Sequence, residues 1–345
     1  MMNSFYQLTF FELRSWLLGN SLSESGASLL YNWHYKKKRI DPCTHNLAKE
    51  TIALIAKQFH FQLPAIIETH LSSDSTVKFL VELTDKEKIE MVLIPFQNKY
   101  TLCLSTQVGC AMKCSFCYTG TQGLKRHLSC EEIIGQFILA DRWLSENRPG
   151  EGKLRNIVFM GQGEPLHNFD AVKKACEILL DQHGASLGAQ RITVSTAGYL
   201  PGLLRWKEEM PGVNLALSLH AIDDEKRSKL IPINAKYPLA QVMDVINSLP
   251  LARKQYIIFE YLLIDEYNDS KEDALKLAHY LDKDRSIVNL IPYNPIPGNS
   301  FRRPSDKKVD DFKIILDEMK IPTLIRGTKG DSILAACGQL NSKNR

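Results

Sequence analysis

Three cysteines stand close together in GCAMKCSFCYTG (residues 109–120), at Cys110, Cys114 and Cys117. Thiolates are soft ligands that suit both zinc and iron–sulfur clusters. A zinc site usually adds a second close pair of cysteines, and no such pair follows Cys117. A four-iron cluster held by three cysteines leaves one iron open to a substrate. The alternatives are a zinc site with a distant fourth ligand, such as His127, and unlinked structural cysteines.

Polar residues also follow the strands predicted after this loop. The segment GQGEP (residues 161–165) provides glycines that let a ligand approach the backbone, and Glu164 can accept a hydrogen bond from an ammonium group. The next strands end in Ser195, Ser218, His220 and Asn294. Each of these residues alone is typical of a turn or a cap, and His220 is equally compatible with the core.

Two further residues whose side chains could take part in a reaction lie far apart in the sequence. Cys337 stands in AACGQL between small residues, and its spacing alone favours a buried free cysteine. Glu90 stands in IEMVLIP, where a strand carboxylate is usually solvated. Spacing alone therefore gives neither residue a chemical role.

Alternating strands and helices must position these groups. Strand-like runs are predicted at 101–106, 156–160, 191–195, 214–219, 256–263, 287–292 and 322–326. Helices are predicted at 129–146, 168–182, 199–209, 238–249, 270–283 and 305–319, with Ser129 and Glu132 as a capping box. This α/β pattern predicts an open, partial (β/α)6-type barrel with functional groups at the carboxyl ends of its strands.

The chain is expected to divide into four parts. Residues 1–75 form a small N-terminal helical domain, 76–97 a β-hairpin linker, 98–330 the partial barrel and 331–345 a C-terminal segment that carries Cys337. Residues 36–39 (KKKR), near Trp33 and Tyr35, offer phosphate contacts beside aromatic surfaces. Basic residues at 125–127 and 302–303 are expected on loops near the barrel mouth.

The overall composition is that of an ordinary folded protein. The chain has 345 residues, 44% hydrophobic and 24% charged, with a net charge of +4 that permits a polyanionic partner. No apolar run is long enough to span a membrane, and the N-terminus lacks a basic start, so a cytoplasmic protein is expected. Eight cysteines are too few for a disulfide scaffold and favour metal or redox chemistry.

The Cys-x3-Cys-x2-Cys spacing, with Phe116 before the last cysteine, resembles the signature of radical S-adenosylmethionine (SAM) enzymes. That resemblance implies a [4Fe-4S] cluster on Cys110, Cys114 and Cys117, whose open iron binds SAM. It further implies a SAM pocket formed by Gly163, Glu164, Ser195, Ser218, Leu219, His220 and Asn294.

A more specific resemblance comes from the order of several motifs. Cys103, the three-cysteine loop, FMGQGEPLHN, VSTAG, LSLHA and AACGQL together resemble the radical SAM adenine methyltransferases of ribosomal RNA, from about Glu90 to Leu340. Gln162 stands where members of that family more often have methionine. The N-terminal domain is similar to the family's RNA-binding domain. The resemblance implies methylation of adenine carbon 2 in 23S rRNA and in tRNA, with carbon 8 as the alternative position.

The resemblance also implies residue roles. One SAM methylates Cys337, and a second SAM supplies the radical that activates the S-methyl group. Glu90 then removes the ring proton, and Cys103 attacks Cys337 to release the product as a disulfide forms. Cys103 and Cys337 should therefore lie close together in the fold. Three cysteines match no family role and are expected to be structural: Cys43, Cys130 and Cys176.

The resemblance also implies two partners, rRNA and an electron donor such as flavodoxin. It implies no contact with a membrane and a monomeric enzyme. Two other classes of function stay open at this point. One is a different radical SAM reaction, in which the paired thiols would have no role. The other is a zinc-dependent RNA-binding module without catalysis.

Overall fold

The computed structural model describes residues 2–41, 46–210, 212–253 and 255–342. Its centre is a ten-stranded sheet with the order β14-β13-β12-β11-β10-β9-β6-β5-β4-β3. Seven neighbouring strands are parallel: β6 (Lys99–Cys103), β9 (Lys153–Phe159), β10 (Ile192–Thr196), β11 (Asn214–Ser218), β12 (Ile257–Leu263), β13 (Ser286–Pro292) and β14 (Thr323–Ile325). The sheet does not close within the described residues, because β14 and β3 form its two edges.

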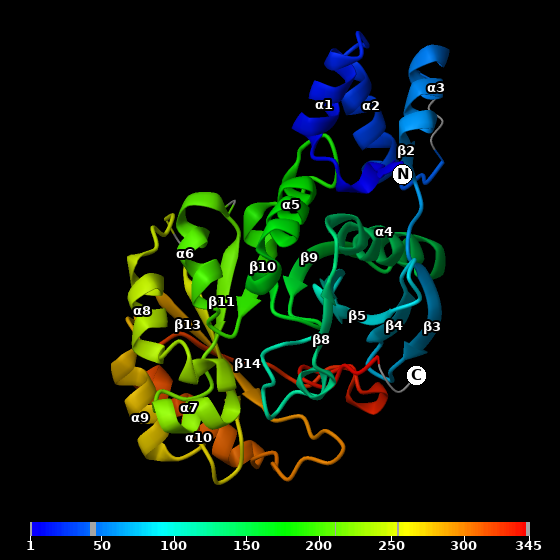
Figure 1. Ribbon diagram of the computed structural model, residues 1–345. Coiled ribbons are helices and arrows are strands. Elements are labelled where there is room, and N and C mark those ends of the chain that lie inside the picture. The colour runs from blue at the N-terminus through cyan, green and yellow to red at the C-terminus, as the bar shows by residue number, and fades with distance from the viewer. Residues whose placement is uncertain (1, 42–45, 211, 254, 343–345) are drawn as a thin grey trace.

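Helices connect the parallel strands and lie around the outside of the curved sheet (Figure 1). They are α4 (Cys130–Asn147), α5 (Phe169–Leu180), α6 (Leu200–Glu209), α7 (Asp224–Leu230), α8 (Leu239–Ser248), α9 (Lys271–Tyr280) and α10 (Asp306–Glu318). The predicted capping box begins α4, since the Ser129 hydroxyl accepts from Glu132 N and the Glu132 carboxylate accepts from Ser129 N. Strands and helices therefore alternate as predicted, and the open partial barrel is confirmed.

The predicted hairpin linker is part of the main sheet. Strands β3 (Ala65–Leu71), β4 (Val77–Glu82) and β5 (Lys88–Phe96) pair antiparallel with one another, and β5 pairs with β6 of the barrel. Residues 65–71 were predicted to belong to the N-terminal helical domain, and this prediction is wrong, because they form strand β3 of the main sheet. The edge strand β3 alternates between exposed and half-buried residues, so no continuous apolar run marks it.

The N-terminal domain lies above α4 and α5 in the view of Figure 1. It contains α1 (Phe10–Gly19), α2 (Ser25–Tyr31), one π-helical turn (Asn32–Lys36) and α3 (Lys49–Gln58), while β1 (Asn3–Ser4) pairs with β2 (Phe59–His60). A capping box between Thr9 and Glu12 begins α1. Residue 43, one of the cysteines expected to be structural, lies outside the described residues.

Short elements complete the fold. Strands β7 (Gln107–Gly109) and β8 (Leu124–His127) pair on either side of the cysteine loop, and sequence analysis predicted neither strand nor α7. The C-terminal segment crosses from β14 toward β3 and β4 (Figure 1). Over the described ranges, no helix is long and apolar enough to cross a membrane.

Candidate active site

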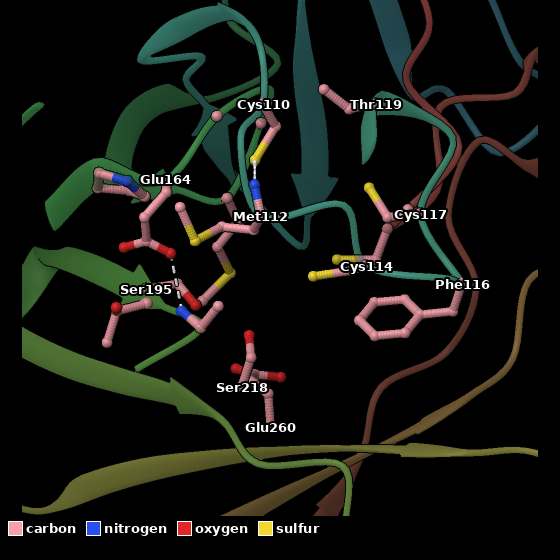
Figure 2. Close-up of a pocket in the computed structure, with 18 of the residues that line it drawn as sticks. Cys110, Met112, Cys114, Phe116, Cys117, Thr119, Glu164, Ser195, Ser218 and Glu260 are labelled. Atoms are coloured by element: carbon pink, nitrogen blue, oxygen red, sulfur yellow. Dashed lines mark hydrogen bonds between the residues drawn. The ribbon is translucent and has the colours of Figure 1, made fainter. Parts of the chain in front are cut away.

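The three cysteines of the loop line one cavity. Figure 2 shows Cys114 and Cys117 beside it, while the sulfur of Cys110 accepts from Met112 N at 3.5 Å. Strand β7 ends at Gly109, and Ser115 N donates to the carbonyl of Leu230 at 3.0 Å, so β7 and α7 both fix the loop. The loop thus presents three thiols to a cavity at the carboxyl end of the parallel strands.

The donor set of this cavity fits an iron–sulfur cluster. Three soft thiols line the cavity, and burial raises the pKa of Cys110 to about 12. Cluster iron, when bound, would offset this rise by binding the thiolate form. No three His, Cys, Asp or Glu side chains in the described ranges are arranged for a single metal ion. The alternative zinc ligand, His127, does not line the cavity, since it lies on β8 and its Nδ1 contacts Gln107 Nε2 at 3.0 Å.

Glu164 faces the cavity from the loop that follows β9. Its Oε2 accepts from Ala197 N at 2.8 Å and its Oε1 from Leu166 N at 3.1 Å, which fixes the carboxylate. Burial raises the pKa of Glu164 to about 7, although these hydrogen bonds act in the opposite direction. Gly163 is required beside it, because it has φ +106° and an added Cβ would lie 2.6 Å from Gln107 Cβ.

The next two strand ends supply three more predicted residues. Ser195 on β10, Ser218 on β11 and His220 all line the same cavity. His220 Nδ1 accepts from Leu262 N at 3.1 Å, and burial lowers its pKa to about 3, so the imidazole is neutral. Its ring meets Phe116 edge to face at 4.8 Å. His220 therefore connects the cysteine loop with the strand ends.

Two predicted residues lie outside the lining of this cavity. Leu219 is fully buried, and its carbonyl accepts from Arg227 Nε at 3.1 Å. Asn294 is buried, and its Nδ2 donates to the carbonyl of Cys337 at 3.3 Å. In this structure Asn294 holds the C-terminal segment, while Leu219 contributes through its main chain.

A second cavity brings Cys103 and Cys337 together, 234 residues apart in sequence. Both thiols are free, and Cys337 also lines the first cavity. Burial raises the pKa of Cys103 to about 12, with the neighbouring Cys337 acting in the same direction. Arg326, which sequence analysis did not single out, lines the second cavity, and its charge opposes the rise in the pKa of both thiols.

Main-chain contacts fix the position of Cys337. Tyr118 N in the cysteine loop donates to the carbonyl of Gly338 at 2.7 Å, and Thr119 Oγ1 donates to that of Leu340 at 2.8 Å. Gly338 has φ +83°, and an added Cβ would lie 3.3 Å from the carbonyl of Phe116. The segment carrying Cys337 therefore packs directly on the loop of the three cysteines.

Glu90 is buried rather than solvated and lines neither cavity. Its Oε1 lies 3.2 Å from Lys78 Nζ, and its Oε2 accepts from Asn341 N at 2.6 Å. Lys78 Nζ also donates to the carbonyl of Leu334 at 3.1 Å. Gln162 accepts from Glu90 N and donates to Ser342 Oγ. Strands β4 and β5 thereby hold the C-terminal segment both before and after Cys337 in the sequence.

Arg227 on α7 is a further residue that sequence analysis missed. It is fully buried, and its Nη2 donates to the carbonyls of Ala197 and Ser218, each at 2.9 Å. Its Nη1 donates to Asn234 Oδ1 at 2.5 Å. Burial lowers the pKa of Arg227 to about 10. The guanidinium ties together the ends of β10 and β11 behind the cavity.

The basic residues expected to face RNA differ in their surroundings. Lys37 and Arg39 lie over the Trp33 ring at 5.7 and 5.8 Å, whereas Tyr35 is buried and offers no stacking surface. The other two basic clusters pair with carboxylates: Lys125 with Glu87, Arg126 with Asp85 and Glu132, and Arg302 with Asp265 and Glu266. Residues 125–127 also lie on β8 rather than on a loop.

Comparison with known proteins places the chain in a family. The Radical SAM superfamily model matches residues 104–278. A dual-specificity RNA methyltransferase RlmN of Paracoccus denitrificans is 42% identical over 304 residues, covering 86% of this chain and 78% of the relative. A dual-specificity RNA methyltransferase RlmN of Campylobacter fetus is 39% identical over 344 residues, covering 95% of this chain and 96% of the relative.

A solved structure agrees with these relatives. The crystal structure of a radical SAM methyltransferase from Sphaerobacter thermophilus superposes with a TM-score of 0.89 at 36% identity, covering 99% of this chain and 100% of that one. The motifs of the cavity, the fold and the relatives thus agree along nearly the whole chain. The chain belongs to the radical SAM superfamily and, within it, to the family of radical SAM adenine methyltransferases of ribosomal RNA.

Proposed function

We propose that this protein methylates carbon 2 of an adenine in 23S rRNA, and of tRNA, through an S-methylcysteine on Cys337. The observation that carries the proposal is that Cys337 lines two cavities, one shared with the three loop cysteines and the other with Cys103. One residue can thus take a methyl group from SAM on one side and meet a resolving thiol on the other. A mere SAM-binding protein does not need this pairing.

The chemistry of adenine explains why a cysteine must carry the methyl group. Carbon 2 is electron-poor and has no lone pair, so it does not displace the methyl group of SAM directly. The cluster, when bound to Cys110, Cys114 and Cys117, would supply the electron that cleaves SAM to a carbon radical. Cys337 first loses its proton and takes a methyl group from one SAM. Its S-methyl group then gives up a hydrogen atom to the carbon radical formed from a second SAM, and the resulting CH2 radical adds to carbon 2 of the ring.

The remaining steps need a base and a second thiol. The ring adduct gives up one electron, which the cluster, when bound, would take back, and one proton, for which Glu90 is the proposed base. The thiolate of Cys103 then attacks the sulfur of Cys337, which forms the disulfide and breaks the bond between that sulfur and the CH2 group on the ring. The CH2 group takes up a proton and becomes the methyl group of the released base. Because Glu90 is held by Lys78 and Asn341, its action as a base requires the C-terminal segment to shift.

Binding roles follow from the same geometry. Glu164 would receive the amino group of SAM, while Ser195, Ser218 and His220 would contact its ribose and adenine. Asn294 and the main chain of Leu219 would support that pocket from behind. Trp33 with its two cations would contact RNA. We further expect two SAM per turnover, a one-electron donor such as flavodoxin, and a cytoplasmic monomer.

Mass spectrometry of nucleosides tests the proposal. Ribosomal RNA and tRNA from cells with and without the gene should differ in 2-methyladenosine. A difference in 8-methyladenosine alone would instead support carbon 8, and no difference would refute RNA methylation. In parallel, Cys103→Ala should accumulate RNA linked to the protein, whereas Cys337→Ala should form neither product nor link. Full activity in either variant would exclude the paired-thiol scheme.

A further inference from the structure

The first cavity contains a carboxylate that none of these steps uses. Glu260 lies in the middle of β12 and is only 4% exposed. It lines the cavity together with Ser218 and Cys337. Figure 2 shows its side chain directed into the cavity beside that of Ser218. An acidic residue within the apolar run IIFEYLL therefore faces the place where the reactants must meet.

The two oxygens of this carboxylate differ in their contacts. Oε1 accepts from Asn289 Nδ2 at 2.8 Å and lies 3.4 Å from Arg326 Nη1. Oε2 is also buried, but it has no hydrogen-bond partner in the described part of the chain. Buried carboxylate oxygens are normally satisfied, because an unpaired one keeps the full cost of lost solvation. The free oxygen thus indicates a donor that a ligand brings into the cavity.

The position of Glu260 narrows the identity of that donor. Its ion-pair partner Arg326 lines the second cavity with Cys103 and Cys337, so the pair marks the boundary between the two cavities. The proposed reaction brings two adenosines to this boundary: the adenosyl group of SAM and the target adenosine of RNA. Both carry an exocyclic amine and ribose hydroxyls, which are hydrogen-bond donors of the required kind.

We propose that Glu260 is an adenosine-binding residue whose Oε2 accepts a hydrogen bond from the amine or a ribose hydroxyl of the bound adenosine. Asn289 and Arg326 hold the other oxygen, so the acceptor is fixed before the ligand arrives. The inference rests on the proposed function, since that function brings adenosines to this cavity. It adds a fixed carboxylate acceptor beside Ser218 in the lining of the cavity.

The test uses anaerobically reconstituted full-length protein with Glu260→Gln, which keeps the shape and exchanges one acceptor oxygen for a donor. The dissociation constant for SAM and the KM for in vitro transcribed 23S rRNA are measured. One of them should rise about ten- to a hundred-fold, as loss of a hydrogen bond to a charged group predicts. A rise for SAM identifies its adenosyl group, and a rise for RNA identifies the target base.

Arg326→Gln is the comparison variant: it removes the ion pair that helps to hold Oε1 but keeps Oε2, so it should weaken binding less than Glu260→Gln does. An equal loss in Arg326→Gln and Glu260→Gln would overturn the inference, as would two unchanged constants. If Glu260→Gln loses affinity for SAM but the wild-type protein does not methylate RNA, only the proposed function is refuted. Methylation with both affinities unchanged would refute only the role of Glu260.

If Glu260→Gln does not fold, the inference is tested by measuring how altered ligands bind to the wild-type protein. Wild-type protein is titrated with S-adenosylhomocysteine and its 6-deamino, 2′-deoxy and 3′-deoxy forms. A short RNA with purine riboside or a deoxynucleotide at the methylated position is compared with its adenosine form. At least one analogue should bind about ten-fold more weakly, as a lost charge-assisted hydrogen bond predicts. Equal affinity for every analogue would overturn the inference.

Discussion

The buried pair of Lys78 and Glu90 allows the structural and catalytic roles of Glu90 to be separated. The two side chains are 1% and 0% exposed, and Nζ lies 3.2 Å from Oε1. Removing one member takes the ion-pair partner away from a charge that stays buried, which costs about 3–5 kcal/mol. Folding entropies scale with chain length, so this loss should lower the Tm of this 345-residue chain by roughly 4–7 °C.

The experiment compares Glu90→Gln, Lys78→Met and the double variant. Each single variant should lose about 3–5 kcal/mol in chemical unfolding, because the remaining buried charge loses its ion-pair partner. The double variant removes both charges and should be more stable than the sum of the single effects predicts, by about 3 kcal/mol or somewhat less. Stability losses that simply add would refute the pairing argument.

Activity then follows a different pattern from stability. If Glu90 is the base, the double variant should regain stability but stay at least about 100-fold below wild-type methylation. It should also accumulate RNA linked to Cys337, because resolution follows deprotonation. Single-turnover assays with 23S rRNA and gel analysis of the link measure both quantities. A double variant that regains activity together with stability would show that Glu90 only holds the C-terminal segment.

Three other outcomes are expected. Because burial raises the pKa of Glu164 to about 7, its carboxylate is protonated as the pH falls through neutrality, and SAM should bind about ten-fold more weakly at pH 6 than at pH 8. Glu164→Gln should flatten this dependence in titrations. Arg227→Met should lower the unfolding free energy of the iron-free protein by about 3–5 kcal/mol, since it leaves buried carbonyls unpaired. After anaerobic reconstitution, Cys114→Ala should lose bound iron, whereas Cys130→Ala on α4 should keep it.

The parallel part of the fold was predictable because its strands are buried on both faces. Such strands give continuous apolar runs, as in Ile257–Leu263, and capped helices such as Cys130–Asn147 separate them. Strand Ala65–Leu71 was missed because it lies at the sheet edge and follows a helix closely. Sequence alone does not distinguish such a half-exposed segment from the end of a helical domain.

The site residues that stand in sequence motifs were predictable, and those that only the packing of the fold brings to the site were not. The cysteines and Glu164 stand in recognisable motifs, whereas Arg227 lies in DEKRSKL, which reads as a solvated charge run. Glu260 did leave a signal, because a carboxylate inside an apolar strand is unusual. Lys78, within the buried strand VKFLVE, left the same signal. Buried charges inside strand runs would therefore have identified two of the missed residues.

The continuity of the sheet limits how the protein can be shortened. Strand β6 has β9 on one side and β5 on the other, so a chain cut at residue 97 would lose the partner of Lys99–Cys103. The cut would leave a row of unpaired backbone groups beside buried apolar side chains, which promotes edge-to-edge aggregation. A soluble catalytic fragment must therefore begin upstream of Ala65, where the edge strand of the sheet starts.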